Sequence, residues 1–372
     1  MRDMLRWFFD LLGEWLGSID LWLLGALAGL MAIGLAVLYS AGGDAQGPHL
    51  MLAQGVRFAV GLVAMWALSR VSPVRLRAWS PGVFVVSLLP LLLVLFIGSG
   101  KHGNLWIDLK LFYLQPSELL KISLPMMLAW YLNREPLPPR IRTVAVTGIL
   151  IGVPVGLILL QPDFGTAMLV TASGVFCLLL AGLPWWWVGI GVGSVAAAAP
   201  VAWFWFLRPY QKDRILTFLD PEHDALGAGW NIIQSKIAIG SGGWTGKGWG
   251  QGTQSHLDFL PEHTTDFAFS VFSEEFGWIG VAVVLALYLF VIGRCLWIAI
   301  EARDTYSRLL AGTIGLAMFV YVVVNGGMIS GLLPVVGVPM PLLSYGGTSA
   351  VSLLAGLGLV MSVKAHRPVH GY

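Results

Sequence analysis

Long uninterrupted runs of apolar residues recur along the chain, and polar residues gather between these runs rather than alternating with apolar ones. A helix needs about 20 such residues to cross the hydrocarbon layer of a membrane, with a range of roughly 17 to 25. The pattern therefore predicts an all-α polytopic membrane protein with about ten transmembrane helices. The predicted spans are 20–41, 50–69, 82–99, 116–132, 144–161, 166–183, 186–206, 276–298, 308–325 and 346–363.

The boundary between the sixth and seventh predicted spans is short. It consists of the three residues Gly182-Leu183-Pro184. Proline ends or kinks a helix, because it lacks an N–H group and clashes with the preceding turn. A nine-span protein with one overlong helix is the alternative to ten spans.

The composition indicates that lipid surrounds much of this protein. Only 11% of the 372 residues are charged and 57% are hydrophobic, whereas about 25% of a soluble domain is charged. These figures exclude a soluble globular enzyme, a disordered chain and a small secreted scaffold. The net charge of +2 is too small to indicate nucleic acid binding. Cys177 and Cys295 lie inside apolar runs, which is not the spacing of a disulfide framework or a zinc site.

Basic residues predict the orientation, because cytoplasmic loops carry an excess of Lys and Arg. With the N-terminus inside, thirteen of the 22 basic residues fall on inner segments, and two, Lys101 and Lys110, fall on short outer loops. The 207–267 loop holds five more, but it is long enough to fall largely outside the rule. We expect both termini in the cytoplasm and the long loop on the outer side.

A single membrane domain with one large outer loop follows from these runs. Spans one to seven cover 20–206, the extracytoplasmic loop covers 207–267, and spans eight to ten with a cytoplasmic tail cover 268–372. In residues 1–19 the apolar side chains share one helical face, which is typical of an amphipathic cytoplasmic helix or of the first turns of span one. The first apolar run has full span length, which argues against a cleavable signal peptide.

Two glycine-rich stretches imitate nucleotide-binding motifs. Residues 98–103 match G-x-G-x-x-G, but they follow a membrane span instead of a strand. The stretch 240–252 contains Gly246-Lys247, but Ser241 and Gly248 stand where a P-loop requires Gly and then Ser or Thr. Neither stretch indicates a nucleotide site.

Glu118 and Lys121 are charged residues at the start of the fourth span, and they are three positions apart on one helical face. Ionisable groups at membrane depth are costly and mark functional sites by default. A self-neutralising pair that faces lipid is one interpretation. A charged wall of an internal cavity is the favoured one, because pairs that face lipid are rare.

Asp163 lies in the short outer connection between the fifth and sixth spans. It could cap the helix that starts near Thr166, or it could line a site at the outer membrane surface. The sequence favours neither role over the other.

Asp266 lies where the long outer loop re-enters the membrane, beside the apolar residues Phe267 and Phe269. Partial desolvation there would raise the pKa of its carboxyl group towards that of a useful general base. The alternative is a helix N-cap, and the sequence leaves the two roles comparable.

The stretch from Asn325 to Ser349 is apolar but contains several Gly and Pro residues. Broken backbone at membrane depth is tolerated only where it is buried or lines a cavity. We therefore expect a re-entrant segment that closes the outer side of a cavity.

Several motifs occur together and in a fixed order, and together they resemble the SEDS family (shape, elongation, division and sporulation). The resemblance covers nearly everything from the first span to Lys364, and it is greatest for the branch that acts in cell elongation. The motifs include Gln115-Pro116-Ser117-Glu118, Gln161-Pro162-Asp163-Phe164-Gly165-Thr166, Gln234-Ser235-Lys236-Ile237-Ala238-Ile239-Gly240, Thr265-Asp266-Phe267 and Pro341-Leu342-Leu343-Ser344-Tyr345-Gly346-Gly347.

The resemblance implies a ten-span glycosyltransferase that polymerises lipid II into peptidoglycan strands outside the cytoplasmic membrane. The family's catalytic aspartate falls on Asp266, and its cavity-lining charged positions fall on Glu118, Lys121 and Asp163. We also place Ser344 among the substrate-binding residues. The implied partners are lipid II, the nascent glycan strand, a class B penicillin-binding protein and other membrane proteins of the elongation complex.

The chemistry of such a transfer suggests roles for these residues. We assign Asp266 as the general base, or as the ligand of a divalent cation such as Mg²⁺ or Mn²⁺. A basic residue must neutralise the leaving diphosphate, and the candidates in the long loop are Arg208, Arg214 and Lys236.

A flippase for lipid-linked precursor and a secondary transporter for a small anion are the alternative functions. We see no repeated halves of the kind many transporters have.

Overall fold

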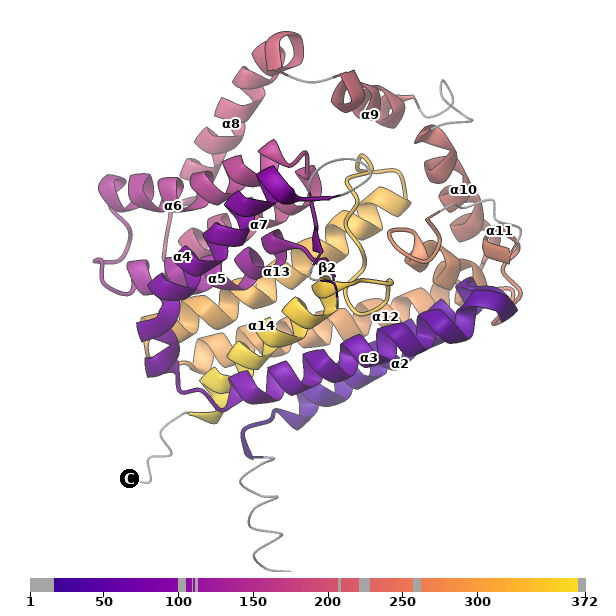
Figure 1. The fold of residues 1–372 in the computed structure, drawn as a ribbon, viewed down its shortest axis with the longest axis horizontal. Coiled ribbons are helices and arrows are strands. Elements are labelled where there is room, and N and C mark those ends of the chain that lie inside the picture. The colour runs from indigo at the N-terminus through magenta and orange to yellow at the C-terminus, as the bar shows by residue number, and fades with distance from the viewer. Residues whose placement is uncertain are drawn as a thin grey trace, which may run out of the picture.

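The computed structural model of this chain describes residues 17–99, 105–108, 110, 113–206, 209–220, 228–256 and 262–366. Within these residues the protein is almost entirely helical (Figure 1), so the predicted all-α polytopic fold is confirmed. The long helices are α2 (Leu21–Ala41), α3 (Gly43–Ser69), α4 (Pro73–Ile97), α5 (Pro116–Leu132), α6 (Ile141–Leu160), α7 (Phe164–Leu180), α8 (Trp185–Val201), α12 (Ala268–Glu301), α13 (Thr305–Ile329) and α14 (Thr348–Ala365).

Each of these helices overlaps one predicted span. Among the described residues, eight helical segments are long and apolar enough to cross a membrane. The other two predicted spans correspond to α5 and α7, which have 17 residues each. The nine-span alternative is wrong: Gly182, with φ of +93°, follows the end of α7, and Pro184 is the N-cap of α8. The helix predicted at the N-terminus falls mainly on residues 1–16, which lie outside the described part of the chain.

Glycines let α3 and α14 pack closely against each other. A Cβ atom on Gly358 of α14 would lie 2.5 Å from the carbonyl oxygen of Met65 in α3. A Cβ atom on Gly61 of α3 would lie 2.6 Å from the side chain of Leu354 in α14. Small residues at such positions allow helices to approach each other in a membrane. This packing brings the segment just before α14 against the middle of α3.

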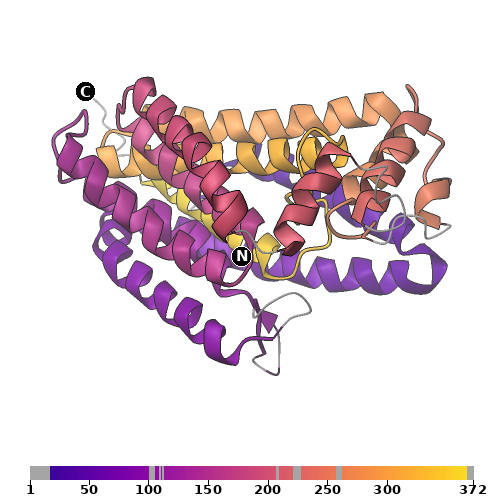
Figure 2. The ribbon, with the colours of Figure 1, turned by 90° about the horizontal axis from the view of Figure 1, so that it is seen from above.

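The apolar core consists of two clusters that share α13. One cluster is formed mainly by α2, α12, α13 and α14, and the other by α4, α5, α6, α7 and α13. Figure 2 shows α12 along one side of the bundle and α4 on the opposite side. Met318 of α13 belongs to the first cluster, and Leu309 and Leu310 belong to the second.

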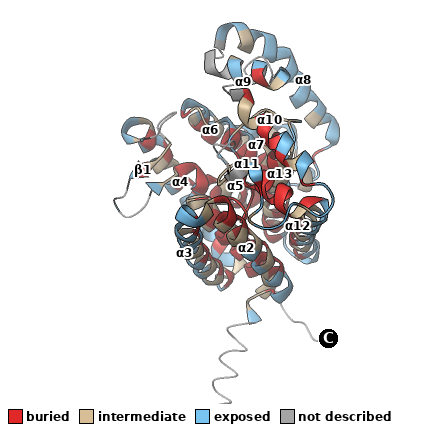
Figure 3. Ribbon diagram, turned by 90° about the vertical axis from the view of Figure 1, so that its right-hand side faces the viewer, coloured by how far each residue is buried: buried red, intermediate tan, exposed pale blue. Residues whose placement is uncertain are grey.

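Smaller elements lie outside the bundle. A hairpin of β1 (Ile107–Asp108) and β2 (Tyr113–Leu114) precedes α5. The helix α8 leans away from the bundle and leads through a short π-helical turn towards α9 (Pro209–Leu219). None of the residues of α8 is buried, as its pale blue and tan ribbon in Figure 3 shows. The helices α10 (Ala228–Ser241) and α11 (Thr253–His256) belong to the long loop 207–267.

The glycine-rich stretch 240–252 docks against a break in α12. Gly277, with φ of +62°, interrupts α12, and a Cβ atom on Gly246 would lie 2.0 Å from the carbonyl oxygen of Glu275. Lys247 donates to the fully buried carboxylate of Glu274 at 2.6 Å. The glycines are thus required for close approach of two backbones.

A buried charge cluster joins three helices at one end of the bundle. The side chain of Asp20, which caps α2, is fully buried. Its carboxylate binds Arg294 of α12 at 2.8 Å and Lys364 of α14 at 2.7 Å. The beginning of the first described long helix and the end of the last one therefore lie on the same side of the bundle.

The substitution Asp20→Asn tests the contribution of this cluster. Asn caps a helix about as well as Asp, but it leaves Arg294 and Lys364 without their carboxylate. We expect a loss of about 3 kcal/mol, the low end of the range for a broken buried ion pair, because both cations are partly exposed. The measurement is the melting temperature in detergent. Asp304→Asn is the matched control, because Asp304 caps α13 through the N–H of Ser307. Equal melting temperatures for the two variants would contradict the prediction.

Candidate active-site cavity

A cavity of about 330 Å³ gathers the charged residues singled out at membrane depth. Four parts of the chain line it: 105–106 together with 115–121, 162–169, 265–266, and 336–349. Glu118, Lys121, Asp163 and Asp266 all contribute to its wall. These residues are far apart in the sequence, so the fold itself brings three carboxylates and one ammonium group to a single site. Their catalytic and binding roles stay predictions.

Asp163 both caps a helix and lines the cavity, which are the two alternatives that the sequence left open. It is the N-cap of α7, where its Oδ1 atom accepts from the N–H of Thr166 at 3.0 Å. It also lines the cavity, and its Oδ2 atom accepts from the side-chain amide of Gln115 at 3.1 Å. The carboxylate thereby joins the start of α7 to the residue before α5.

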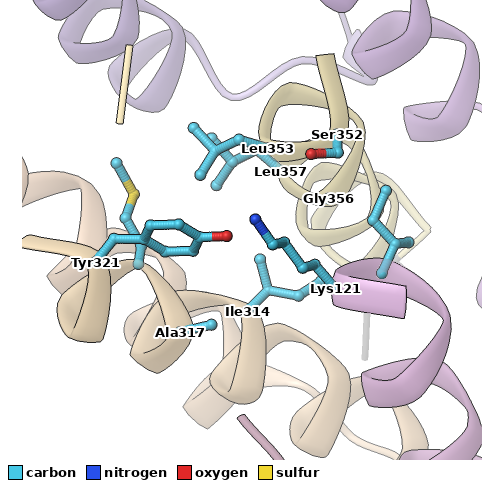
Figure 4. A pocket seen from close by; sticks show the side chains of 10 residues that line it. Lys121, Ile314, Ala317, Tyr321, Ser352, Leu353, Gly356 and Leu357 are labelled. Atoms are coloured by element: carbon cyan, nitrogen blue, oxygen red, sulfur yellow. The ribbon is translucent and has the colours of Figure 1, made fainter. Parts of the chain in front are cut away.

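Glu118 and Lys121 form an ion pair in the wall of the cavity. Lys121 Nζ lies 2.6 Å from Glu118 Oε1, and Ser352 of α14 donates to Glu118 Oε2 at 2.6 Å. Lys121 also lies 5.0 Å from the centre of the Tyr321 ring of α13. Figure 4 shows its ammonium group between Tyr321 and Ser352, and all three residues line a smaller, mostly apolar pocket of about 40 Å³. The pair thus points to the interior of the bundle rather than to lipid.

Asp266 does not cap α12. The N-cap of α12 is Phe267, and no side chain caps the helix there. The capping interpretation of Asp266 is therefore wrong, while its side chain lines the cavity. A Cβ atom on Gly337 would lie 3.6 Å from Asp266 Oδ2, so the re-entrant segment passes close to this carboxylate.

Asn325 of α13 forms hydrogen bonds to two backbone segments that line the cavity. Its side-chain amide donates to the carbonyl oxygen of Asp266 at 2.8 Å and to that of Val338 at 2.7 Å. The residue is fully buried, and its Oδ1 atom has no hydrogen-bond partner in the described part of the chain. Two backbone segments on the cavity wall therefore depend on one amide group.

The segment between α13 and α14 is non-helical and reaches into the bundle. A Cβ atom on Gly165 of α7 would lie 2.4 Å from the carbonyl oxygen of Val336. Tyr288 of α12 donates to the carbonyl oxygen of Pro341 at 2.5 Å. Broken backbone at this depth is supported by such contacts and by the cavity that it lines.

The other predicted site residues are not brought to this cavity by the described structure. Lys236 is exposed and packs over Gly331. Ser344 is buried, accepts from the N–H of Met340 at 2.9 Å, and lines a separate pocket of about 20 Å³. Arg208 lies outside the described residues, and the side chain of Arg214 is not described either.

Sequence reasoning did not assign a role to Asn325, Ser352 or Tyr345. Asn325 and Ser352 are single polar residues within apolar runs, and that was the one signal that could have identified them. Tyr345 lines the cavity from within the Pro341–Gly347 motif, where only Ser344 was chosen. Their partners are distant in sequence, so no local pattern shows these contacts.

The fit of the cavity to a metal ion is limited. Within the part of the chain that the structure describes, no group of three or more His, Cys, Asp or Glu residues could hold one. Glu118 and Asp163 use both carboxylate oxygens in hydrogen bonds to protein groups. A cation at Asp266 would thus need ligands from water and from a bound substrate.

Comparison with known proteins gives concordant matches over nearly the whole chain. The family model FTSW_RODA_SPOVE, described as cell cycle protein, matches residues 16–368. The peptidoglycan glycosyltransferase MrdB of Escherichia coli K12 is 45% identical over 350 residues, which is 94% of each chain.

Solved structures match as well. One is described as "Structural coordination of polymerization and crosslinking by a peptidoglycan synthase complex"; it has a TM-score of 0.82 and 33% identity and covers 94% of this chain and 98% of that chain. The rod shape determining protein RodA of Thermus thermophilus has a TM-score of 0.72 and 31% identity, with 94% and 98% coverage.

The ion pair of Glu118 and Lys121 can be tested by single and double substitution. Glu118→Gln or Lys121→Met alone leaves one buried charge without its partner, which costs about 3–5 kcal/mol. We expect each single variant to lose stability or activity, and the double variant to be more stable than the sum of the two losses predicts. The measurements are the melting temperature and the polymerisation of lipid II. Two stable and active single variants would show that the pair is not part of the cavity's function.

Proposed function

The chain belongs to the FTSW_RODA_SPOVE family of cell cycle proteins, and from this we propose that it is a peptidoglycan glycosyltransferase. It polymerises lipid II into glycan strands at the outer face of the cytoplasmic membrane during cell elongation. The observation that carries the proposal is the cavity that unites Glu118, Lys121, Asp163 and Asp266. The E. coli relative named peptidoglycan glycosyltransferase, 45% identical over 94% of each chain, supports it.

The reaction requires one proton acceptor and one site for a leaving anion. A hydroxyl group of the acceptor sugar attacks the anomeric carbon of the donor, and the bond from that carbon to the lipid diphosphate breaks. The electron pair of that bond goes to the diphosphate, and the proton of the hydroxyl goes to the base. One carboxylate is enough for a single displacement, whereas a retaining glycosidase needs two.

Asp266 is our assignment for the base. Glu118 is bound by Lys121 and Ser352, and Asp163 is bound by Gln115 and the N–H of Thr166, so hydrogen bonds position both carboxylates on the cavity wall. Asp266 lines the same cavity and sits next to the turn that enters α12, at a position where Asn325 holds its backbone. This placement suits a group that must keep a fixed distance from an attacking hydroxyl.

The proposal also includes an orientation in the membrane and a cellular location. The excess of Lys and Arg on one set of loops supports cytoplasmic termini and an outer position for the long loop. The ion pair of Asp20 with Lys364 supports a common side for both termini. We propose a location in the bacterial cytoplasmic membrane, with the cavity open towards the outer side.

A class B penicillin-binding protein is the partner we propose, along with other membrane proteins of the elongation complex. Support comes from the relative with a TM-score of 0.82, whose description is of polymerisation and crosslinking by a peptidoglycan synthase complex. A transpeptidase at the outer face could crosslink the strands that the cavity produces. Nothing in the cavity specifically favours the flippase alternative.

The requirement for a cation is a separate proposal. Mg²⁺ binds proteins through one or two carboxylates together with substrate phosphates and water, so Asp266 and a bound diphosphate could hold Mg²⁺ or Mn²⁺. When bound, the cation would supply positive charge to the leaving diphosphate. We expect a chelator to abolish polymerisation and added Mg²⁺ or Mn²⁺ to restore it. Full polymerisation by metal-stripped protein in the chelator would refute the requirement.

The substitution Asp266→Asn tests the assignment of the base. Asn has nearly the same shape but neither accepts a proton nor binds a cation well. We expect loss of at least about 99% of polymerisation, since general base catalysis contributes typically 10²–10⁴-fold, and a melting temperature close to that of the unmodified protein. Glycan synthesis from lipid II by purified protein, with its partner present, is the measurement.

Asp304→Asn serves as the control for a conservative change elsewhere in the bundle, because its side chain contacts only the start of α13 among the described contacts. Near-normal synthesis by the Asp266 variant would remove Asp266 from the mechanism. Asp163 would then be the next carboxylate to test.

A further inference from the structure

Arg57 is a cation within the membrane-spanning part of α3, half-buried and about two turns from the predicted outer end of that span. Its guanidinium group donates to the hydroxyl of Tyr345 at 2.8 Å and to the side-chain oxygen of Gln54 at 3.3 Å. It also lies 4.2 Å from the centre of the Tyr345 ring. An arginine at this depth is costly unless it is paired or used for binding.

The contacts of Arg57 within the described residues are to neutral groups. The other intramembrane cation, Lys121, has Glu118 as its partner, whereas no described carboxylate forms an ion pair with Arg57. A guanidinium carries five N–H donors, and two are engaged with Tyr345 and Gln54. Next to it, the fully buried Gln54 has a side-chain NH₂ group with no hydrogen-bond partner among the described residues. Positive charge and spare donors therefore gather without a matching anion.

Tyr345 connects this group to the cavity. Its side chain lines the cavity, and its backbone N–H donates to the carbonyl oxygen of Thr264, two residues before Asp266, at 2.8 Å. The hydroxyl oxygen of Tyr345 accepts from Arg57, which leaves the hydroxyl proton for another acceptor. A hydroxyl whose oxygen accepts from a cation is a stronger donor, because hydrogen bonds in a chain polarise one another.

We propose that Arg57 and Tyr345 form a subsite at the wall of the cavity for the diphosphate of the lipid-linked sugar donor. The Tyr345 hydroxyl donates to a phosphate oxygen, and Arg57 supplies positive charge from behind the ring. This inference rests on the proposed glycosyltransferase function, and it moves the diphosphate contact from the outer loop to α3. Negative charge on the diphosphate grows as its bond to the anomeric carbon breaks, so the interaction strengthens during the reaction.

A diphosphate suits the subsite better than a carboxylate or a single phosphate would. Lys121 lies on the same cavity but is neutralised by Glu118, and Lys236 is exposed away from it. Glu118, Asp163 and Asp266 on the cavity wall repel every anion, so a preference for diphosphate must come from the number of oxygens that the donors bind. A diphosphate can span from the Tyr345 hydroxyl to a second donor, whereas a monophosphate has fewer oxygens for the same groups.

A binding titration measures the affinity of the subsite for its ligand without requiring catalytic turnover. Purified full-length protein would be titrated with a polyprenyl diphosphate and with the corresponding monophosphate. Arg57→Met removes the charge, and Tyr345→Phe removes the hydroxyl while keeping the ring. A hydrogen bond to a charged group is typically worth a factor of about ten or more, so each variant should bind the diphosphate about tenfold more weakly and bind the monophosphate with a smaller change.

The matched control is Arg70→Gln. Arg70 follows α3 at its other end and stacks on Trp66 at 5.0 Å, so it has the same kind of ring contact far along the helix from Tyr345. This variant should keep the preference of the unmodified protein for diphosphate over monophosphate. The double variant of Arg57 and Tyr345 should lose little more than either single variant, because the two act on one ligand oxygen.

The outcomes separate the subsite from its alternatives. A purely structural role would lower the melting temperature of both variants without changing the ratio of the two affinities, and that result would overturn the proposal. Unchanged affinity in Tyr345→Phe would overturn it as well, even if Arg57→Met failed to fold. If the unmodified protein bound the diphosphate selectively but did not polymerise lipid II, the proposed function would fail while the subsite stood.

Discussion

A charge inside a hydrocarbon layer must be neutralised or hydrogen-bonded, and the arrangement of this bundle depends on how it meets that requirement. Asp20 brings Arg294 and Lys364 together at one end of the bundle. Glu118 and Lys121 do the same at the cavity, with Ser352 completing the carboxylate's contacts. Each of these groups connects helices that are distant in sequence, so the helices are held in place by their polar residues as well as by apolar packing.

The same requirement applies to the backbone. Between α13 and α14 the chain leaves helical geometry inside the bundle, where its carbonyl groups need partners. Asn325 and Tyr288 supply side-chain donors to Val338 and Pro341. Glycines in α2 and α7 allow this segment to approach, as the contact of Gly165 with Val336 shows. The cavity exists because the bundle accommodates an irregular segment at this depth.

The sequence predicted the spans well, because length and apolarity alone decide whether a helix can cross a membrane. The positions of Glu118 and Lys121 on one helical face were predictable for the same reason: helical spacing is local. The contacts of Ser352 with Glu118 and of Arg57 with Tyr345 were not predictable, because each joins residues more than 200 positions apart. Of the two roles left open for Asp266, the N-cap is wrong by one residue, since Phe267 occupies the N-cap position of α12. Local pattern locates such a carboxylate near a helix start, but tertiary contacts decide where that helix begins.

The amide of Asn325 has a mechanical consequence. One planar amide group binds the carbonyl oxygens of Asp266 and Val338, so these two parts of the cavity wall are both tied to α13. A displacement of α13 carries both of them in the same direction. The two hydrogen bonds thus couple the spacing between Asp266 and the segment at Val338 to the position of α13.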